Sequence, residues 1–137
     1  MQDKELYRQI LGIESPWFVD RVELKLESGE IHIHLEHRST EWPCPECGRA
    51  CNVYDHQPER RWRHLDTCQY QTILYAQPPR SDCPTHGPKV VKLPWAEPGS
   101  RFTALFEAVA IHWLQHASQK AVGKQLKLSW DEVHSIM

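Results

Sequence analysis

Two short motifs constrain this chain more than any other feature: Cys44-x-x-Cys47 and Cys83-x-x-His86. Each motif lies in a turn rich in proline, and each is followed at once by a glycine. Two thiolate or imidazole groups on such a turn can bind one metal ion together, and two turns supply the four ligands of tetrahedral zinc. The glycine lets each turn fold back, so that backbone amides can face the sulfur atoms. The sequence therefore predicts one zinc ion with these four ligands: Cys44, Cys47, Cys83 and His86.

Four protein ligands leave no open coordination position, so the predicted ion is structural rather than catalytic. The residues between the two pairs leave room for a hairpin, which is typical of a zinc ribbon. Two alternatives stay open: Cys51 could replace His86 as the fourth ligand, or the two pairs could be a coincidence. Cys68 is interpreted as a small hydrophobic residue. Other histidines are expected to be solvated on strands rather than to form a second metal site: His32, His34, His37, His56 and His64.

The charge of the chain is uneven. The formal net charge is −2, but residues 1–43 hold 5 Lys and Arg against 9 Asp and Glu, whereas residues 44–137 hold 11 against 9. This asymmetry predicts that an anionic partner binds the second part. No apolar run approaches the roughly 18 residues of a membrane span, and no signal peptide is recognised at the start. We therefore expect a cytoplasmic protein with no membrane partner, whose five cysteines serve metal binding or burial rather than disulfides.

The pattern of apolar residues predicts an α+β fold, in which a small β-rich zinc ribbon with a hairpin precedes a helical segment. A helix is expected over residues 3–12, with Leu6, Ile10 and Leu11 on one face. A hairpin should turn at Ser28-Gly29, and a second pair of strands, 60–65 and 70–76, at Asp66-Thr67. A last short strand is expected at 89–93. The predicted domains are 1–43 (helix and hairpin), 44–93 (zinc ribbon) and, beyond a linker at 94–99, 101–137 (helix-turn-helix).

The helical segment has the features of a helix-turn-helix. Helical spacing over 101–116 predicts one apolar stripe, made by Phe102, Leu105, Phe106, Val109 and Trp113. Shorter helices follow at 119–126 and 130–137, where Gly123 would let the two helices pack closely. Ser129 and Glu132 form a capping-box pattern that starts the last helix. Lys127 stands where the turn often carries glycine, so the turn must tolerate a less favourable conformation. A generic helical bundle is the alternative.

Cationic and aromatic residues indicate where a nucleic acid could bind. In the stretch 60–64, Arg61 and Arg63 share one strand face, while Trp62 and His64 share the other. The exposed arginines could contact phosphates, or they could simply guard an edge strand against pairing. Lysines of the first short helix and exposed residues of the second could reach DNA. The candidate DNA-binding residues are Arg60, Arg61, Arg63, Lys120, Lys124, Lys127, Trp130, His134 and Ser135.

Several motifs in this order resemble the amino-terminal region of the ISL3 family of bacterial insertion-sequence transposases, over roughly residues 15–137. They are Cys44-Pro45-x-Cys47-Gly48, Arg61-Trp62-Arg63-His64-Leu65-Asp66, Pro79-Arg80-x-x-Cys83-x-x-His86-Gly87, Pro94-Trp95-Ala96 and Arg101-Phe102-Thr103. The resemblance implies the same four zinc ligands. It also implies binding to double-stranded DNA at the terminal inverted repeats of the element, for DNA transposition.

Relatives of this kind carry, in addition, a catalytic domain with an RNase-H-like fold and three acidic metal-binding residues. We expect no such domain here, hence no catalytic residue, no small-molecule substrate and no transposition by this chain alone. The chain would be a fragment or a naturally short reading frame. Two alternatives remain: a regulator or inhibitor that occupies the same DNA or binds full-length transposase, or a protein-interaction zinc ribbon. A second copy of this chain, in a homo-oligomer, is a further possible partner.

Overall fold

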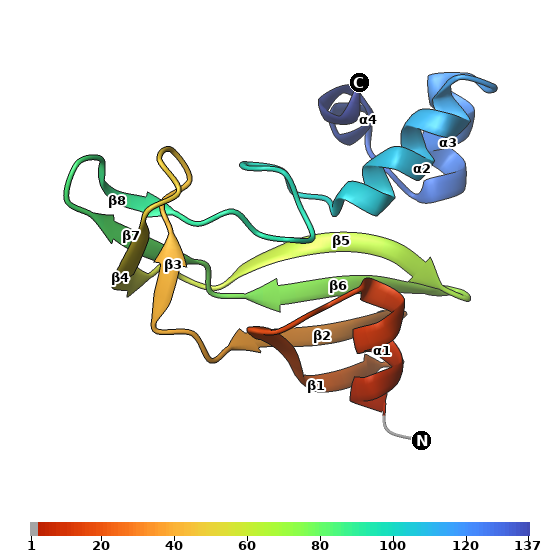
Figure 1. Ribbon diagram of the computed structural model, residues 1–137. Coiled ribbons are helices and arrows are strands. Elements are labelled where there is room, and N and C mark those ends of the chain that lie inside the picture. The colour runs from red at the N-terminus through yellow and green to blue at the C-terminus, as the bar shows by residue number, and fades with distance from the viewer. Residues whose placement is uncertain (1–2) are drawn as a thin grey trace.

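The computed structural model describes residues 3–137 as eight strands and four helices (Figure 1). In chain order they are α1 (Asp3–Leu11), β1 (Trp17–Lys25), β2 (Glu30–His37), β3 (Glu41–Pro43), β4 (Ala50–His56), β5 (Arg60–Thr67), β6 (Tyr70–Ala76), β7 (Pro79–Cys83), β8 (Gly87–Val90), α2 (Ala104–Leu114), α3 (Gln119–Leu126) and α4 (Trp130–Ile136). The predicted α+β class, with a β-rich part followed by helices, is confirmed. None of the described helices has the length and apolar character to cross a membrane.

The larger sheet has the strand order β1-β2-β6-β5. The hairpins β1–β2 and β5–β6 are antiparallel, and β2 and β6 join them in parallel. Alternate residues of β2 (Ile31, Ile33 and Leu35) are buried on the inner face, because side chains along a strand point to its two faces in turn. Because β6 belongs to the predicted zinc-ribbon segment and β2 to the segment before it, one sheet spans both. The three-domain division itself stays a prediction.

The smaller sheet has the order β3-β4-β7-β8 and is antiparallel throughout. Figure 1 shows it at the end of the larger sheet, away from the helices. Aromatic side chains fill the junction. Trp17 of β1 contacts Trp42 of β3 and Trp95 of the segment before α2, with ring centroids 5.7 and 4.8 Å apart. Trp95 also meets Trp62 of β5, which is fully buried. Large aromatic rings in tilted and edge-to-face contact thus hold the two sheets and the following segment together.

The helices α2, α3 and α4 lie beside β5, on the side away from α1 (Figure 1). The chain enters them by pairing with β5, because the N–H of Arg63 donates to the carbonyl of Arg101 (3.0 Å) and the N–H of Thr103 donates to the carbonyl of Arg63 (3.0 Å). Thr103, Ser118 and Ser129 cap the three helices through their side-chain oxygens. The helical segment is therefore joined to the sheet by backbone as well as by side chains.

The expected buried faces of two helices are partly wrong. In α1 the buried side chain is Tyr7, whose hydroxyl contacts Thr67, whereas Leu6 and Ile10 are exposed and Leu11 packs partly buried against the core. At α2 the buried stripe consists of Phe102, which lies just before the helix, Phe106 and Ala110, so two of the five expected members are buried. The expected members Leu105 and Trp113 are instead about half exposed. The small residue Ala110 is fully buried in this helix, where the larger Leu105 and Trp113 had been expected.

The strand predictions are partly confirmed. The β5–β6 turn comes later than expected, at Cys68, which is exposed and has a positive φ of 57°. Cys68 is therefore not a buried hydrophobic residue. The last strand is Gly87–Val90 rather than 89–93. Strands β3, β4 and β7 were not predicted, because they are short or carry polar, proline-rich sequences whose partners are distant along the chain.

Candidate metal centre and nucleic-acid interface

Two tight turns bring the cysteine and histidine motifs together. In the first, the N–H of Gly48 donates to the carbonyl of Cys44 (2.8 Å), and the N–H of Cys44 donates to the carbonyl of Arg49 (2.9 Å). The second turn connects β7 to β8, where Cys83 is paired with Gly87. Gly48 and Gly87 have φ values of 75° and 74°, a conformation that glycine adopts without strain. The predicted role of the two glycines in these turns is confirmed.

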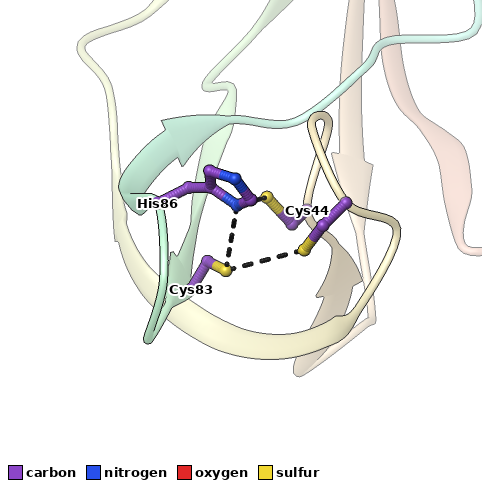
Figure 2. A group of neighbouring side chains, drawn as sticks. Cys44, Cys83 and His86 are labelled. Carbon is purple, nitrogen blue, oxygen red and sulfur yellow. Dashed lines mark hydrogen bonds between the residues drawn. The ribbon is translucent and has the colours of Figure 1, made fainter.

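The side chains of Cys44, Cys47, Cys83 and His86 converge, and their four ligand atoms all lie within 4.8 Å of one another. Figure 2 shows Cys44, Cys83 and His86 facing the same point. The Nδ1 atom of His86 lies 3.7 Å from the sulfur of Cys44 and 3.6 Å from that of Cys83, and the sulfurs of Cys47 and Cys83 are 3.8 Å apart. A tetrahedron with zinc–sulfur bonds of about 2.3 Å has edges of about 3.8 Å. The donor set and its spacing therefore fit zinc.

Backbone amides favour the thiolate form at two of these cysteines. The N–H groups of His86 and Thr85 face Cys83 and lower the pKa of its thiol to about 6. The pKa of Cys44 is also lowered, chiefly by the N–H of Cys47. The thiolate is the form that binds a metal ion. On the outer side of the group, Nε2 of His86 lies 3.4 Å from a carboxylate oxygen of Glu46, the kind of partner that orients a metal-binding imidazole.

Cys51 lies next to this group but does not join it. It is buried, its sulfur donates to the carbonyl of Arg49 (3.2 Å), and burial raises the pKa of its thiol. The geometry thus favours His86 over Cys51 as the fourth ligand. Among the described residues, no other group of three or more His, Cys, Asp or Glu side chains is close enough to hold a metal ion.

Not all of the histidines that were expected to be solvated are exposed. His64 is buried, with its Nδ1 atom 2.7 Å from Oγ1 of Thr103. The Nε2 atoms of His37 and His56 are 2.8 Å apart, which links the ends of β2 and β4. His32 and His34 are partly buried beside Tyr75. The simple expectation of exposed strand histidines is wrong at His64, because the following segment covers that strand.

The three arginines of β5 differ in their surroundings. Arg61 is exposed. Arg60 stacks its guanidinium on Trp62 and donates to the carbonyl of Ser100 (3.3 Å). The guanidinium of Arg63 donates to the carbonyls of Leu126 and Lys127 at the end of α3, lies over the ring of Phe106, and contacts Asp66. Only Arg61 therefore presents an unengaged guanidinium, whereas Arg63 connects the sheet to the helices.

The turn between α3 and α4 has the predicted features. Lys127 has φ 58° and ψ 50°, the left-handed conformation in which a non-glycine residue is strained. A Cβ atom on Gly123 would meet the carbonyl oxygen of Leu128 at 3.2 Å and a methyl group of Val133 at 3.5 Å, so the position needs a very small residue. Both hydrogen bonds of the Ser129–Glu132 capping box are formed.

The remaining candidate DNA-binding residues lie on α3 and α4. Lys120, Lys124 and Trp130 border one hollow between the two helices. Trp130 is 61% exposed, and its ring contacts that of His134 with centroids 4.3 Å apart. Ser135 is exposed and donates its hydroxyl to the carbonyl of Glu132 (2.8 Å). The solvent face of α4 is therefore aromatic and polar, and lysines flank it.

Sequence reasoning did not single out Arg101 as a site residue, although it named the Arg101-Phe102-Thr103 motif. In the structure Arg101 is exposed, beside β5, and lines a hollow together with Arg61 and Lys127. Its placement depends on the pairing of residues 101–103 with β5, for which a single sequence gives no signal.

Comparison with known proteins matches two parts of the chain to described families. Residues 40–86 match the zinc finger of the transposases IS204/IS1001/IS1096/IS1165, and residues 91–137 match the helix-turn-helix domain of transposase family ISL3. No solved structure matches the chain.

Two curated proteins of Mycobacterium tuberculosis, from strains CDC 1551 / Oshkosh and ATCC 25618 / H37Rv, are each 31% identical to this chain over 144 aligned residues. Each is a transposase for insertion sequence element IS1557. The alignment covers 100% of this chain and 32% of each relative, so the chain spans about a third of their length. With its two matched segments, the chain carries the zinc-finger and helix-turn-helix domains of the ISL3 family of transposases.

Proposed function

We propose that this chain is a DNA-binding module of a transposase and that it recognises the terminal inverted repeats of an insertion sequence. The solvent face of α4 supports this proposal most directly. Trp130, His134 and Ser135 project from the second helix of a helix-turn-helix, the element that enters the major groove in proteins of this class. Lys120 and Lys124 on α3 stand where they can meet the phosphates beside that groove.

We further propose that Cys44, Cys47, Cys83 and His86 bind a single structural zinc ion. All four corners of a tetrahedron are then filled by protein, which leaves no position for an activated water molecule. The ion would fix β7 and β8 against the turn before β4, and thereby the smaller sheet as a whole. The role of residues 3–137 in this proposal is binding to DNA.

The test is fluorescence anisotropy with the zinc-loaded protein and two short DNA duplexes, one with the terminal inverted repeat of the encoding element and one with the same bases shuffled. We expect tighter binding to the repeat. Replacing His134 by Ala should reduce this preference, because a base contact is worth about 1–3 kcal/mol of discrimination. Ile111→Ala, on an exposed position of α2, is the matched control. Equal binding of the two duplexes would contradict recognition of the repeat.

Two other functions are distinguished by the same measurement. A regulator that competes for the element ends would also bind the repeat, and would lower transposition when mixed with full-length transposase. A protein-interaction zinc ribbon would bind neither duplex, even at low salt. That result would overturn the DNA-binding proposal.

A further inference from the structure

A hollow at the junction of the larger sheet and the helices concentrates positive charge. It has a volume of about 360 Å³, and β5, the 101–102 segment and the α3–α4 turn all contribute to it. Its charged lining residues are Arg61, Arg63, Arg101, Lys127, Glu30 and Glu132. We call this hollow the junction notch. Four cations against two carboxylates stand out in a protein with a net charge of −2.

The carboxylates of the junction notch are already engaged by nearby groups. An oxygen of Glu30 lies 2.8 Å from Nε2 of His32, and an oxygen of Glu132 accepts the Ser129 N–H (2.9 Å) of the capping box. In contrast, Arg61, Arg101 and Lys127 are exposed, and none of them forms an ion pair with a described residue. Three unpaired cations therefore face one small hollow.

The backbone at two of the cations of the junction notch, Arg101 and Lys127, is fixed by neighbouring contacts. Arg101 belongs to a segment that is hydrogen-bonded to Arg63 of β5, and the neighbouring Phe102 is buried. Lys127 begins the turn into α4, where Arg63 donates to its carbonyl (3.1 Å). The sheet and the helix-turn-helix thus both contribute cations to the same hollow.

We propose that the junction notch binds a phosphate group of the DNA backbone through Arg61, Arg101 and Lys127. This inference rests on the proposed DNA-binding function, which it extends from α4 to the β-sheet part of the protein. A phosphate contact immediately beside the helix-turn-helix turn fixes the orientation of the protein on the duplex without reading bases. Through this contact the sheet helps to set how α4 enters the groove.

The test measures how the affinity for the shuffled duplex depends on salt, because contacts with phosphates do not depend on sequence. Between about 50 and 200 mM salt, each lost phosphate contact should reduce the slope of log K against log salt by about 0.9, which is about a 3.5-fold smaller loss of affinity over that range. The variants are Arg61→Gln, Arg101→Gln and the double variant. Arg101→Lys keeps the charge and should keep the slope. Lys4→Gln, an exposed lysine on α1, is the matched control.

Because the three cations share one phosphate group, we expect the double variant to reduce the slope by about 0.9, each single variant to reduce it by part of that amount, and Lys4→Gln to leave it unchanged. Circular dichroism checks that the variants fold, as expected for exposed side chains. If the wild type binds the duplex but all three glutamine variants keep its slope, the junction notch is not a phosphate site and the proposed function stands. If the wild type fails to bind at low salt, the proposed function itself fails.

Discussion

The Nδ1 atom of His64 lies 2.7 Å from the Oγ1 atom of Thr103, and the same threonine oxygen accepts the backbone N–H of Phe106 at the start of α2. One hydroxyl group thus serves both β5 and the first helix of the helical segment. All three residues are buried. The sheet and the helices are therefore connected by a shared hydrogen-bond network, in addition to the backbone pairing of residues 101–103.

Replacing Thr103 by Val should separate the contribution of this hydroxyl from that of the side-chain volume. Loss of the helix cap alone costs about 0.5–2 kcal/mol, and His64 also loses its partner. Thr103→Ser keeps the hydroxyl and removes only a methyl group, so it should be the milder change. Urea unfolding followed by tryptophan fluorescence measures both. Equal free energies of unfolding for the two variants would show that the hydroxyl contributes nothing.

Burial lowers the pKa of His64, so its imidazole should resist protonation in the folded protein. The unfolded chain has an ordinary histidine pKa of about 6.5 and binds the proton more readily. The free energy of unfolding should therefore decrease as the pH falls through about 6.5 and level off below the lowered pKa of the folded state. An NMR titration of the His64 ring in zinc-loaded protein measures this directly. A ring pKa at or above 6.5 would be inconsistent with the buried, neutral imidazole.

Lys127→Gly should increase stability while it weakens DNA binding. Glycine adopts the left-handed conformation of this position without strain, and the gain should be about 1 kcal/mol. The carbonyl that accepts from Arg63 remains, but one cation of the junction notch is lost. Thermal unfolding and the salt dependence of DNA binding measure the two effects. Lys124→Gly, inside α3, is the control for the stability measurement alone and should destabilise by about 1 kcal/mol. A lower melting temperature for Lys127→Gly would refute the strain argument.

Substitutions of Arg63 and Arg61 should have different effects on stability and on DNA binding, although the two residues are only two positions apart on the same strand. Arg63→Gln removes charge-assisted hydrogen bonds to the end of α3, each worth about 1.5–3 kcal/mol, and should increase hydrogen exchange in α3 and α4. DNA affinity should fall with little change in its salt dependence. Arg61→Gln should show the reverse: ordinary stability and a smaller salt dependence. If Arg63→Gln reduced the salt dependence as Arg61→Gln does, with unchanged exchange, Arg63 would be a phosphate contact.

Features that depend on neighbours in sequence could be predicted, and those that depend on distant partners could not. The two metal-binding turns, the capping box at Ser129 and the close approach at Gly123 follow from a few adjacent residues, and the structure contains them. The parallel pairing of β2 with β6 joins strands that are separated along the chain by β3, β4 and β5, and no local pattern encodes it. The engagement of Arg63 by α3 has the same origin, since its partners are more than 60 residues away.

The faces of α1 and α2 show a second limit of sequence reasoning. Counting aliphatic residues favoured Leu6 and Ile10 in α1, but Tyr7 is buried because its hydroxyl finds Thr67 on β5. In α2 the large residue Trp113 was expected to be buried, but it is about half exposed, whereas the small residue Ala110 is fully buried. Which face of a short amphipathic helix is buried depends on the shape of the surface that receives it.

The central claim is that one zinc ion, held by Cys44, Cys47, Cys83 and His86, organises this DNA-binding module. Native mass spectrometry of wild type, Cys83→Ser and Cys51→Ser tests it most directly. Cys51→Ser is the matched control, because a hydroxyl can replace the thiol that donates to Arg49. We predict one zinc ion in the wild type and in Cys51→Ser, and none in Cys83→Ser, which should also lose its folded state. Wild type without zinc, or a folded Cys83→Ser that retains the ion, would contradict the claim.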